Sequence, residues 1–178
     1  MTSHPPASGV LAADAPSGVP LPPTSPDTPL EAVVIGAGFG GICMGRALRQ
    51  AGIAHFVILE RAQEVGGVWR DNRYPGAACD VPSHLYSFSF APKPDWPRTF
   101  ATQPDILAYL RDCTRAFGLL PHLRLGREVA QARFDEAHAV WTILTTSGAT
   151  LHTRLLVSAT GLLSRPALPS IPGRDSFA

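Results

Sequence analysis

Hydrophobic residues follow two different periods along this chain, and each period predicts a kind of element. Short apolar runs at residues 30–35 and 55–59 predict two buried strands. Between them, residues 42–51 carry apolar side chains at helical spacing, and Gly52 marks the end of a predicted helix. After residues 1–29, the chain therefore begins with a β-α-β unit.

A second helix is predicted in the middle of the chain. Thr102 suits an N-cap, because a proline follows early in the helix and Asp105 lies three residues on. Apolar residues, Cys113 among them, then repeat on one face until Gly118 ends the helix. This face is predicted to belong to the core, where Cys113 acts as a small buried hydrophobe.

Beyond residue 122 the period changes to two, which is typical of strands. Three strands are predicted, over residues 123–134, 140–146 and 150–159, with a hairpin turn at Ser147-Gly148 before the last. The final strand ends at Thr160-Gly161, and a glycine in that place lets the backbone pass close to a ligand. Strands mixed with helices in this order indicate an α/β fold.

Two stretches lack a regular period. Residues 66–80 contain glycine and proline breaks that make them too irregular for a helix. They also carry aromatic and charged side chains, which favours a loop that lines a site. In residues 84–90 the aromatic side chains Tyr86, Phe88 and Phe90 alternate with smaller ones. That pattern fits either a strand or an irregular segment packed under the ring of a cofactor.

The first predicted strand runs into a glycine-rich turn with the spacing G-x-G-x-x-G. Gly36 allows the tight turn, Gly38 lets the backbone approach a pyrophosphate, and Gly41 lets the next helix pack against the strand. The helix then presents its positive end to the phosphates. A strand before the turn and a helix after it favour a dinucleotide site over a plain glycine-rich loop.

An acidic residue stands where such a site needs one. Glu60 ends the second predicted strand, about 20 residues past the glycines, where a carboxylate is expected to accept two ribose hydroxyls. Arg61 would suit a 2′-phosphate, but the charge of Glu60 repels that group. FAD or NAD is therefore favoured over NADP at this site.

Composition narrows the function classes further. The chain has 178 residues, enough for one domain, and its net charge of +1 with scattered basic residues gives no indication of nucleic acid or of an anionic membrane. Its apolar runs stay well short of the roughly 20 residues that span a bilayer. The three cysteines are widely spaced, so neither a disulfide framework nor a metal site is predicted, and a reducing cytoplasm is expected: Cys43, Cys79 and Cys113.

The segment 66–80 carries a resemblance to a known family. It fills the pattern [AG]-G-x-W-x4-[FY]-P-[GM]-x3-D at every fixed position, from Gly66 to Asp80. In this it resembles the flavin-dependent Baeyer–Villiger monooxygenases, which are related to flavin-containing monooxygenases. Residues 158–173 are similar to the segment that joins the FAD domain of that family to its NADPH domain.

The resemblance implies a fold and a domain plan. The expected fold is a Rossmann-like FAD-binding domain with three layers, a parallel sheet and a β-meander, incomplete at its C-terminus. Residues 1–29, rich in proline, are expected to be a disordered tail. Residues 30–163 would then be the N-terminal part of the FAD-binding domain, and residues 164–178 a linker towards a missing NADPH domain.

The resemblance also implies site residues. Asp80 matches a family aspartate beside the flavin that orients a downstream arginine, so it is the candidate catalytic residue. Asp80 is a candidate cofactor ligand as well. The other candidates for binding FAD are the glycine-turn and strand-end residues together with their neighbours: Gly36, Gly38, Gly41, Glu60, Arg61, Gly67, Val68, Trp69 and Tyr86.

The chemistry implied is the NADPH- and O₂-dependent insertion of oxygen into a ketone through a flavin C4a-peroxide. The family's second signature would start at Phe177, and the chain ends at Ala178. The chain alone is therefore expected to be inactive. An N- or S-oxygenating relative and an inactive FAD-binding remnant stay open as alternatives. A disulfide reductase is disfavoured, because none of the cysteines has another near it in sequence.

Overall fold

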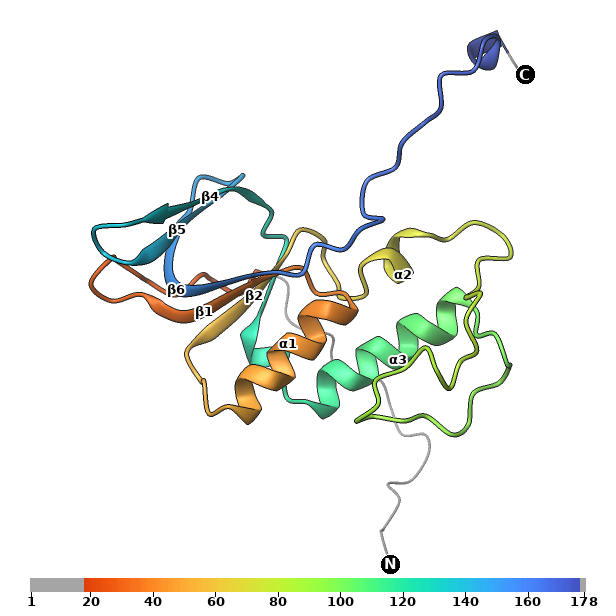
Figure 1. The fold of residues 1–178 in the computed structure, drawn as a ribbon, viewed down its shortest axis with the longest axis horizontal. Helices are drawn as coiled ribbons and strands as arrows, with labels where there is room; N and C mark the ends of the chain where they lie inside the picture. Colours follow the sequence, from red (N-terminus) through yellow and green to blue (C-terminus); the bar gives the residue numbers. More distant parts are fainter. Residues whose placement is uncertain (1–17, 177–178) are drawn as a thin grey trace, which may run out of the picture.

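A six-stranded sheet with the order β3-β2-β1-β6-β5-β4 forms the centre of the computed structural model, which describes residues 18–176 (Figure 1). The parallel part consists of four strands: β1 (Leu30–Ile35), β2 (Phe56–Glu60), β3 (Leu123–Leu125) and β6 (Thr150–Ser158). Two strands continue from β6 as an antiparallel meander: β5 (Val140–Thr145) and β4 (Val129–Asp135).

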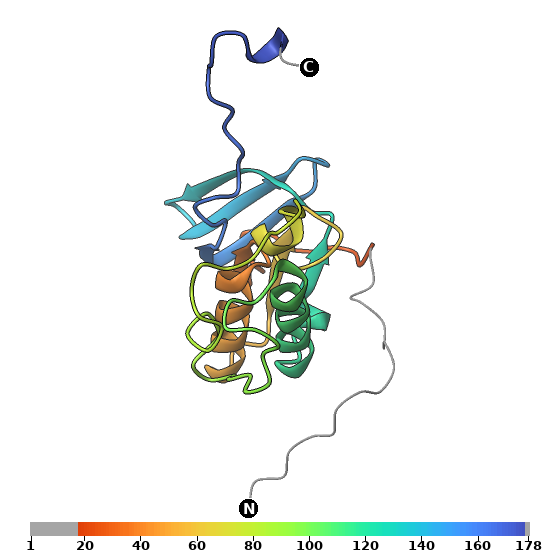
Figure 2. The same cartoon turned by 90° about the vertical axis from the view of Figure 1, so that its right-hand side faces the viewer.

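Two long helices cover one face of the parallel strands, and the meander covers the other. Helices α1 (Phe39–Gln50) and α3 (Gln103–Ala116) lie side by side below the sheet in Figure 2, with the blue-green meander above it. The core on the helix side includes Ile58 and Leu110, whereas on the other side Val33 packs with Ile143 and Leu151 of the meander. The predicted α/β, Rossmann-like architecture is confirmed.

Three short helices complete the chain: α2 (Val68–Asp71) and the 3₁₀ turns η1 (Leu120–His122) and η2 (Arg174–Ser176). The prediction that residues 66–80 are too irregular for a helix is therefore wrong for one turn of them. Gly66 and Gly67 both have positive φ, 124° and 54°, so they bend the chain immediately before α2 and leave room for a single turn.

The start of α3 agrees with its predicted cap. The side chain of Asp105 accepts a hydrogen bond from the backbone N–H of Thr102 at 3.1 Å and from its hydroxyl at 2.5 Å. These bonds satisfy groups that a helix start leaves open. Cys113 is buried on the apolar face of α3, as predicted.

The strand predicted over residues 123–134 is two strands on opposite edges of the sheet. Gly126 takes a φ of +65° after β3, and its N–H donates to Ala62 O at 2.8 Å. The chain then crosses to the meander, where β4 pairs with β5. Both strands alternate with the same period of two, so the pattern along the chain does not mark the break.

Residues 84–90 form an irregular segment, so of the two alternatives the strand is excluded. The hydroxyl of Tyr109, on α3, accepts from Phe88 N at 2.9 Å and donates to Ala91 O at 2.8 Å. A side chain of α3 thus supplies backbone partners that a neighbouring strand would otherwise provide.

The first described residues lie against the sheet. Leu21 packs on the meander-side core, Thr24 Oγ1 accepts from His152 N at 2.9 Å, and Pro20 O accepts from Arg124 Nε at 2.9 Å. These ordered contacts differ from the disordered tail expected over residues 1–29. Their partners lie far away in the sequence, so the local composition does not reveal them. Residues 1–17 of that expectation are outside the described part of the chain.

At the other end, residues 161–165 stay close to the body, where Ser164 O accepts from Arg61 Nη2 at 3.2 Å, and the chain after them extends away from the molecule (Figure 1). The apolar side chains of residues 161–176 are exposed, with Leu162 at 100% and Leu168 at 79%. Phe177, where the second family signature was expected to start, lies outside the described residues. None of the helices within residues 18–176 is long and apolar enough to cross a membrane.

Candidate functional site

A cleft of about 230 Å³ opens at the carboxyl ends of the central parallel strands. Its walls come from the residues that follow β1, from the end of β2, from the turn before α2 and from the chain after β6. In open parallel sheets, ligands bind beyond the carboxyl ends of the strands. The fold therefore places this cleft where a dinucleotide is expected.

The glycine turn after β1 forms the floor of the cleft. A Cβ on Gly36, whose φ is +101°, would lie 2.5 Å from the backbone oxygen of Ala159. A Cβ on Gly41 would lie 1.8 Å from Gly36 O, so α1 packs too tightly on this turn for any side chain. These two glycines thus have structural roles that agree with the spacing argument.

A second glycine turn approaches the first across the cleft. A Cβ on Gly67 would lie 3.2 Å from the Cα of Gly38, and a Cβ on Gly38 would lie 3.6 Å from the Cα of Gly67. Helix α1 begins directly after Gly38, has no acidic residue in its first turn and therefore directs an uncompensated positive end at this point. Bare backbone and a helix N-terminus together make a site for phosphate.

Glu60 lies in the wall of the cleft, only 4% exposed. Its Oε2 accepts from the backbone N–H of Ala37 at 2.9 Å. Its Oε1 accepts from Ala62 N at 3.0 Å and from an Nη1 hydrogen of Arg70 at 2.9 Å. A carboxylate has about four lone-pair sites. Glu60 therefore keeps one site, on Oε2, rather than the two needed for the expected pair of ribose hydroxyls.

Arg70 connects Glu60 to two further charged residues of the cleft, Asp71 and Arg61. Its Nε donates to Asp71 Oδ1 at 2.8 Å, and Arg61 contacts Asp71 Oδ2 at 3.5 Å. Burial acts to lower the pKa of Arg70, but the hydrogen bonds and charges of Asp71 and Glu60 outweigh it and hold that pKa above its ordinary value. The hydrogen bond from Arg70 lowers the pKa of Asp71.

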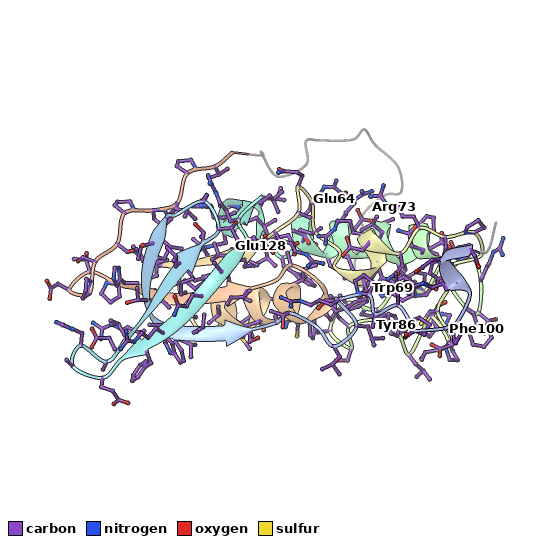
Figure 3. The ribbon with its side chains drawn as sticks, turned by 90° about the horizontal axis from the view of Figure 1, so that it is seen from above. Glu64, Trp69, Arg73, Tyr86, Phe100 and Glu128 are labelled. Carbon is purple, nitrogen blue, oxygen red and sulfur yellow. The ribbon has the colours of Figure 1, made fainter. Side chains whose placement is uncertain are left out.

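The aromatic candidates lie beside this cleft. Trp69, on α2, donates from its indole Nε1 to the hydroxyl of Tyr86 at 3.0 Å, and the two side chains lie close together in Figure 3. Their rings meet edge to face with centroids 5.6 Å apart. Gln103, at the start of α3, donates to Trp69 O. The structure thus brings Trp69 and Tyr86 together.

The sequence-predicted residues fall into three groups. Gly36, Gly38, Glu60, Arg61, Gly67 and Val68 all line the cleft. Gly41 lies in the packed interface behind it. Among the described residues, the cleft wall does not include Trp69, Tyr86 or Asp80. Asp80 is exposed in the loop that follows the bridge between Ala78 and Thr102.

Sequence reasoning missed several residues of the cleft. Arg127 and Glu128 follow β3, and Ser164 and Arg165 lie on the extended chain after β6. The N–H of Arg127 donates to Glu60 O at 2.8 Å, which sets it beside the end of β2. The period of two does not change there, so the available signal was Gly126 itself, because a glycine inside a predicted strand can mark a break that leaves Arg127 beyond a strand end.

The residues present fit the adenosine diphosphate half of FAD. The turns at Gly38 and Gly67 line the cleft with bare backbone, and α1 begins directly after Gly38. Glu60 offers an acceptor for a hydroxyl. Arg127 lines the cleft as well and adds a positive charge to its wall. Acceptors, donors and open backbone thus match a ribose joined to a pyrophosphate.

Comparisons with known proteins agree with this geometry. Residues 34–103 match the family profile of the NAD(P)-binding Rossmann-like domain. A Baeyer–Villiger monooxygenase of Streptomyces coelicolor is 56% identical over 148 residues, which cover 83% of this chain and 28% of that protein. The phenazine N-monooxygenase PhzNO1 of Lysobacter antibioticus is 39% identical over 154 residues, which cover 84% of this chain and 28% of that protein.

A solved structure of OTEMO in complex with FAD and NADP superimposes with a TM-score of 0.76 at 37% identity. The superimposed part covers 83% of this chain and 29% of the OTEMO chain. The chain thus spans less than a third of the length of the relatives that it matches. Over the matched residues, this chain is therefore a homologue of the Baeyer–Villiger and related flavin-dependent monooxygenases.

Proposed function

We propose that this chain is the FAD-binding part of a monooxygenase that uses NADPH and O₂ to insert an oxygen atom into a ketone. The observation that carries the proposal is the cleft itself, where two glycine turns face each other beside the buried carboxylate of Glu60. Homology to proteins named Baeyer–Villiger monooxygenase supports the reaction class.

In this proposal each residue has a defined task. Gly38 and Gly67 admit the pyrophosphate to bare backbone, Gly36 allows the turn between β1 and α1, and the N-terminus of α1 stabilises the charge of the pyrophosphate. Glu60 accepts one hydroxyl of the adenosine ribose. Arg61 and Val68 line the same cleft and shield the cofactor from water. Bound FAD supplies the redox chemistry through which electrons from NADPH activate O₂.

Trp69, Tyr86 and Asp80 are proposed on the flavin side of the cofactor. Support comes from the chain itself, because Trp69 directly follows the cleft residue Val68 and is bonded to Tyr86. Asp80 is exposed and so is free to orient a cationic group supplied by another part of the protein. We also propose a cytoplasmic protein, since all three cysteines are free thiols.

The test is a titration of the purified chain with FAD, followed by flavin fluorescence. We expect one FAD per chain and a Kd that rises about tenfold or more in Glu60→Ala, because a hydrogen bond to a charged group is lost. Asp80→Ala is expected to keep the wild-type Kd. Glu31→Ala is the matched control, since its carboxylate accepts a backbone N–H from His55 at the opposite end of the sheet.

Equal Kd values for wild type and Glu60→Ala would refute the ribose assignment. Absence of FAD binding by the wild-type chain would refute the proposed function. A second candidate is N-oxygenation, favoured by the relative named phenazine N-monooxygenase. The full-length gene product distinguishes the two, because a cyclic ketone yields a lactone and a phenazine yields an N-oxide, both resolved by mass spectrometry.

A further inference from the structure

Arg70 is buried and contacts three other residues, of which Glu60 and Asp71 line the cleft. Its side chain is 6% exposed and bonds the carboxylate of Glu60 from Nη1. The same nitrogen donates to Glu64 O at 2.8 Å, while Nε and Nη2 donate to the two carboxylate oxygens of Asp71 at 2.8 and 3.1 Å. Its planar fork is thus held on two sides, so the guanidinium has one orientation.

That orientation decides which lone pair of Glu60 stays open. Oε1 is occupied by Arg70 and by Ala62 N, so both of its acceptor sites are used. Oε2 accepts only from Ala37 N, and Glu60 is a wall residue of the cleft. Rotation of the carboxylate would break the bond to Arg70 in the buried interior, where an unpaired charge is costly.

Arg70 also links this carboxylate to the second glycine turn. It lies on α2, two residues after Val68 and three after Gly67, which both line the cleft. Its bonds to Glu60 and Glu64 O therefore hold the turn at a fixed place relative to the end of β2. The carboxylate and the bare backbone opposite it are set by one side chain.

We propose that Arg70 is a positioning residue that fixes Glu60 with a single acceptor site towards the cleft, so that Glu60 takes one hydroxyl of the adenosine ribose of a bound dinucleotide. This inference rests on the proposed function. It assigns to the ribose site a wall residue of the cleft that acts through Glu60, and it limits Glu60 to one hydroxyl rather than two.

The experiment compares three ligands: FAD and its analogues that lack either the 2′- or the 3′-hydroxyl of the adenosine ribose. In the wild-type chain, one analogue is expected to bind about tenfold more weakly than FAD through loss of the bond to Glu60, and the other within about threefold. Equal losses of tenfold or more for both analogues would overturn the single acceptor site.

Arg70→Met removes the guanidinium at similar length. It is expected to bind FAD and both analogues within about threefold of each other, because the carboxylate is then free to turn. A merely structural role would weaken all three ligands by the same factor and leave the discrimination intact, which would overturn the proposal. Arg73→Met is the matched control, since Arg73 lies two residues past the end of α2 and pairs with Glu64; it is expected to discriminate as wild type does.

Arg70→Lys covers the case in which Arg70→Met does not fold. Lysine retains the charge but cannot bond Glu60, Glu64 O and both oxygens of Asp71 from a planar fork. We expect it to fold, as measured by circular dichroism, and to discriminate between the analogues less than wild type. Wild-type discrimination in Arg70→Lys would overturn the proposal while leaving FAD binding, and so the proposed function, in place.

Discussion

The glycines at the start of α1 differ in what an added methyl group would meet. At Gly41 the new Cβ would lie 1.8 Å from a backbone oxygen, which cannot move without displacing the turn after β1. At Gly40 the nearest atom would be the Cβ of Ala159 at 3.5 Å, an ordinary contact. Two adjacent positions of one helix therefore respond to the same substitution in opposite directions.

We predict that Gly41→Ala lowers the free energy of unfolding by about 3 kcal/mol or more, since overpacking against backbone cannot relax. Gly40→Ala is the control and is expected to be neutral or to gain up to about 1 kcal/mol from helix propensity. Urea unfolding followed by circular dichroism measures both. Equal stabilities for the two variants would contradict the packing argument.

A second residue-scale prediction concerns His122, whose ring stacks on Phe56 at 3.9 Å between centroids. Burial lowers its pKa, and the charges of Arg49 and Arg124 lower it further, against the hydrogen bond to Phe56 O. The folded chain thus binds this proton less tightly than the unfolded chain. Stability from His122 is complete above about pH 6.5 and falls as the pH drops through the lower folded pKa.

Replacement by Gln should remove this contribution. We expect the free energy of unfolding of His122→Gln to depend less steeply on pH than that of wild type between about pH 5 and pH 7. Urea unfolding at a series of pH values measures the slope. His84→Gln, at an exposed position, serves as the control.

At the element scale, α3 organises a segment that has no secondary structure of its own. Burial raises the pKa of Tyr109 well above its ordinary value, so its hydroxyl stays protonated and donates to Ala91 O. The same hydroxyl accepts from Phe88 N. Arg46, on α1, adds its guanidinium over the ring of Phe90 at 3.9 Å. Both helices thus hold the loop that carries Tyr86.

We predict that Tyr109→Phe lowers the free energy of unfolding by about 1–3 kcal/mol, because a buried backbone N–H and a carbonyl lose their partner. Hydrogen exchange should show faster exchange at Phe88 N in the variant. Tyr74→Phe is the control, since Tyr74 is 64% exposed. An unchanged exchange rate at Phe88 N would count against the role given to the hydroxyl.

Elements governed by local sequence were predictable, and elements governed by distant contacts were not. The glycine turn, Glu60 at a strand end and the capping box of Thr102 depend on residues a few positions apart, so their patterns are visible along the chain. The break at Gly126 and the docking of residues 18–29 depend on partners elsewhere in the sheet.

The site shows the same division. Gly36, Gly38 and Glu60 belong to one continuous motif, and the structure places them in the cleft as expected. Arg127 reaches the cleft only because β3 pairs with β2, and Arg165 only because β6 pairs with β1. The number of hydroxyl groups from which Glu60 can accept hydrogen bonds depends on its bond with Arg70. The spacing of residues along the chain does not indicate that bond.

On the scale of the whole molecule, residues 18–29 connect the two halves of the sheet. Pro20 O accepts from Arg124 beside β2, and Thr24 accepts from β6, which carries the meander. Leu21 packs between these two contacts on the meander-side core. The segment therefore acts as a strap across the face that the helices leave open.

We predict that Leu21→Ala lowers the free energy of unfolding by about 1 kcal/mol, in line with a half-buried side chain, and lowers Tm by about 2–4 °C. Differential scanning calorimetry measures both. Leu85→Ala is the control, because Leu85 is 76% exposed. A Tm equal to that of wild type would show that the strap contributes no stability.

The pairing of β1 with β6 has a consequence for how the chain acquires its structure during synthesis. Leu30 and Thr153 meet although 123 residues separate them. While the ribosome makes the intervening residues, β1 has only β2 beside it, and its other edge is open to any extended peptide nearby. Contacts of such long range also slow folding. We therefore expect the nascent chain to pass through a long interval in which the open edge of its central strand is prone to aggregation, until β6 emerges.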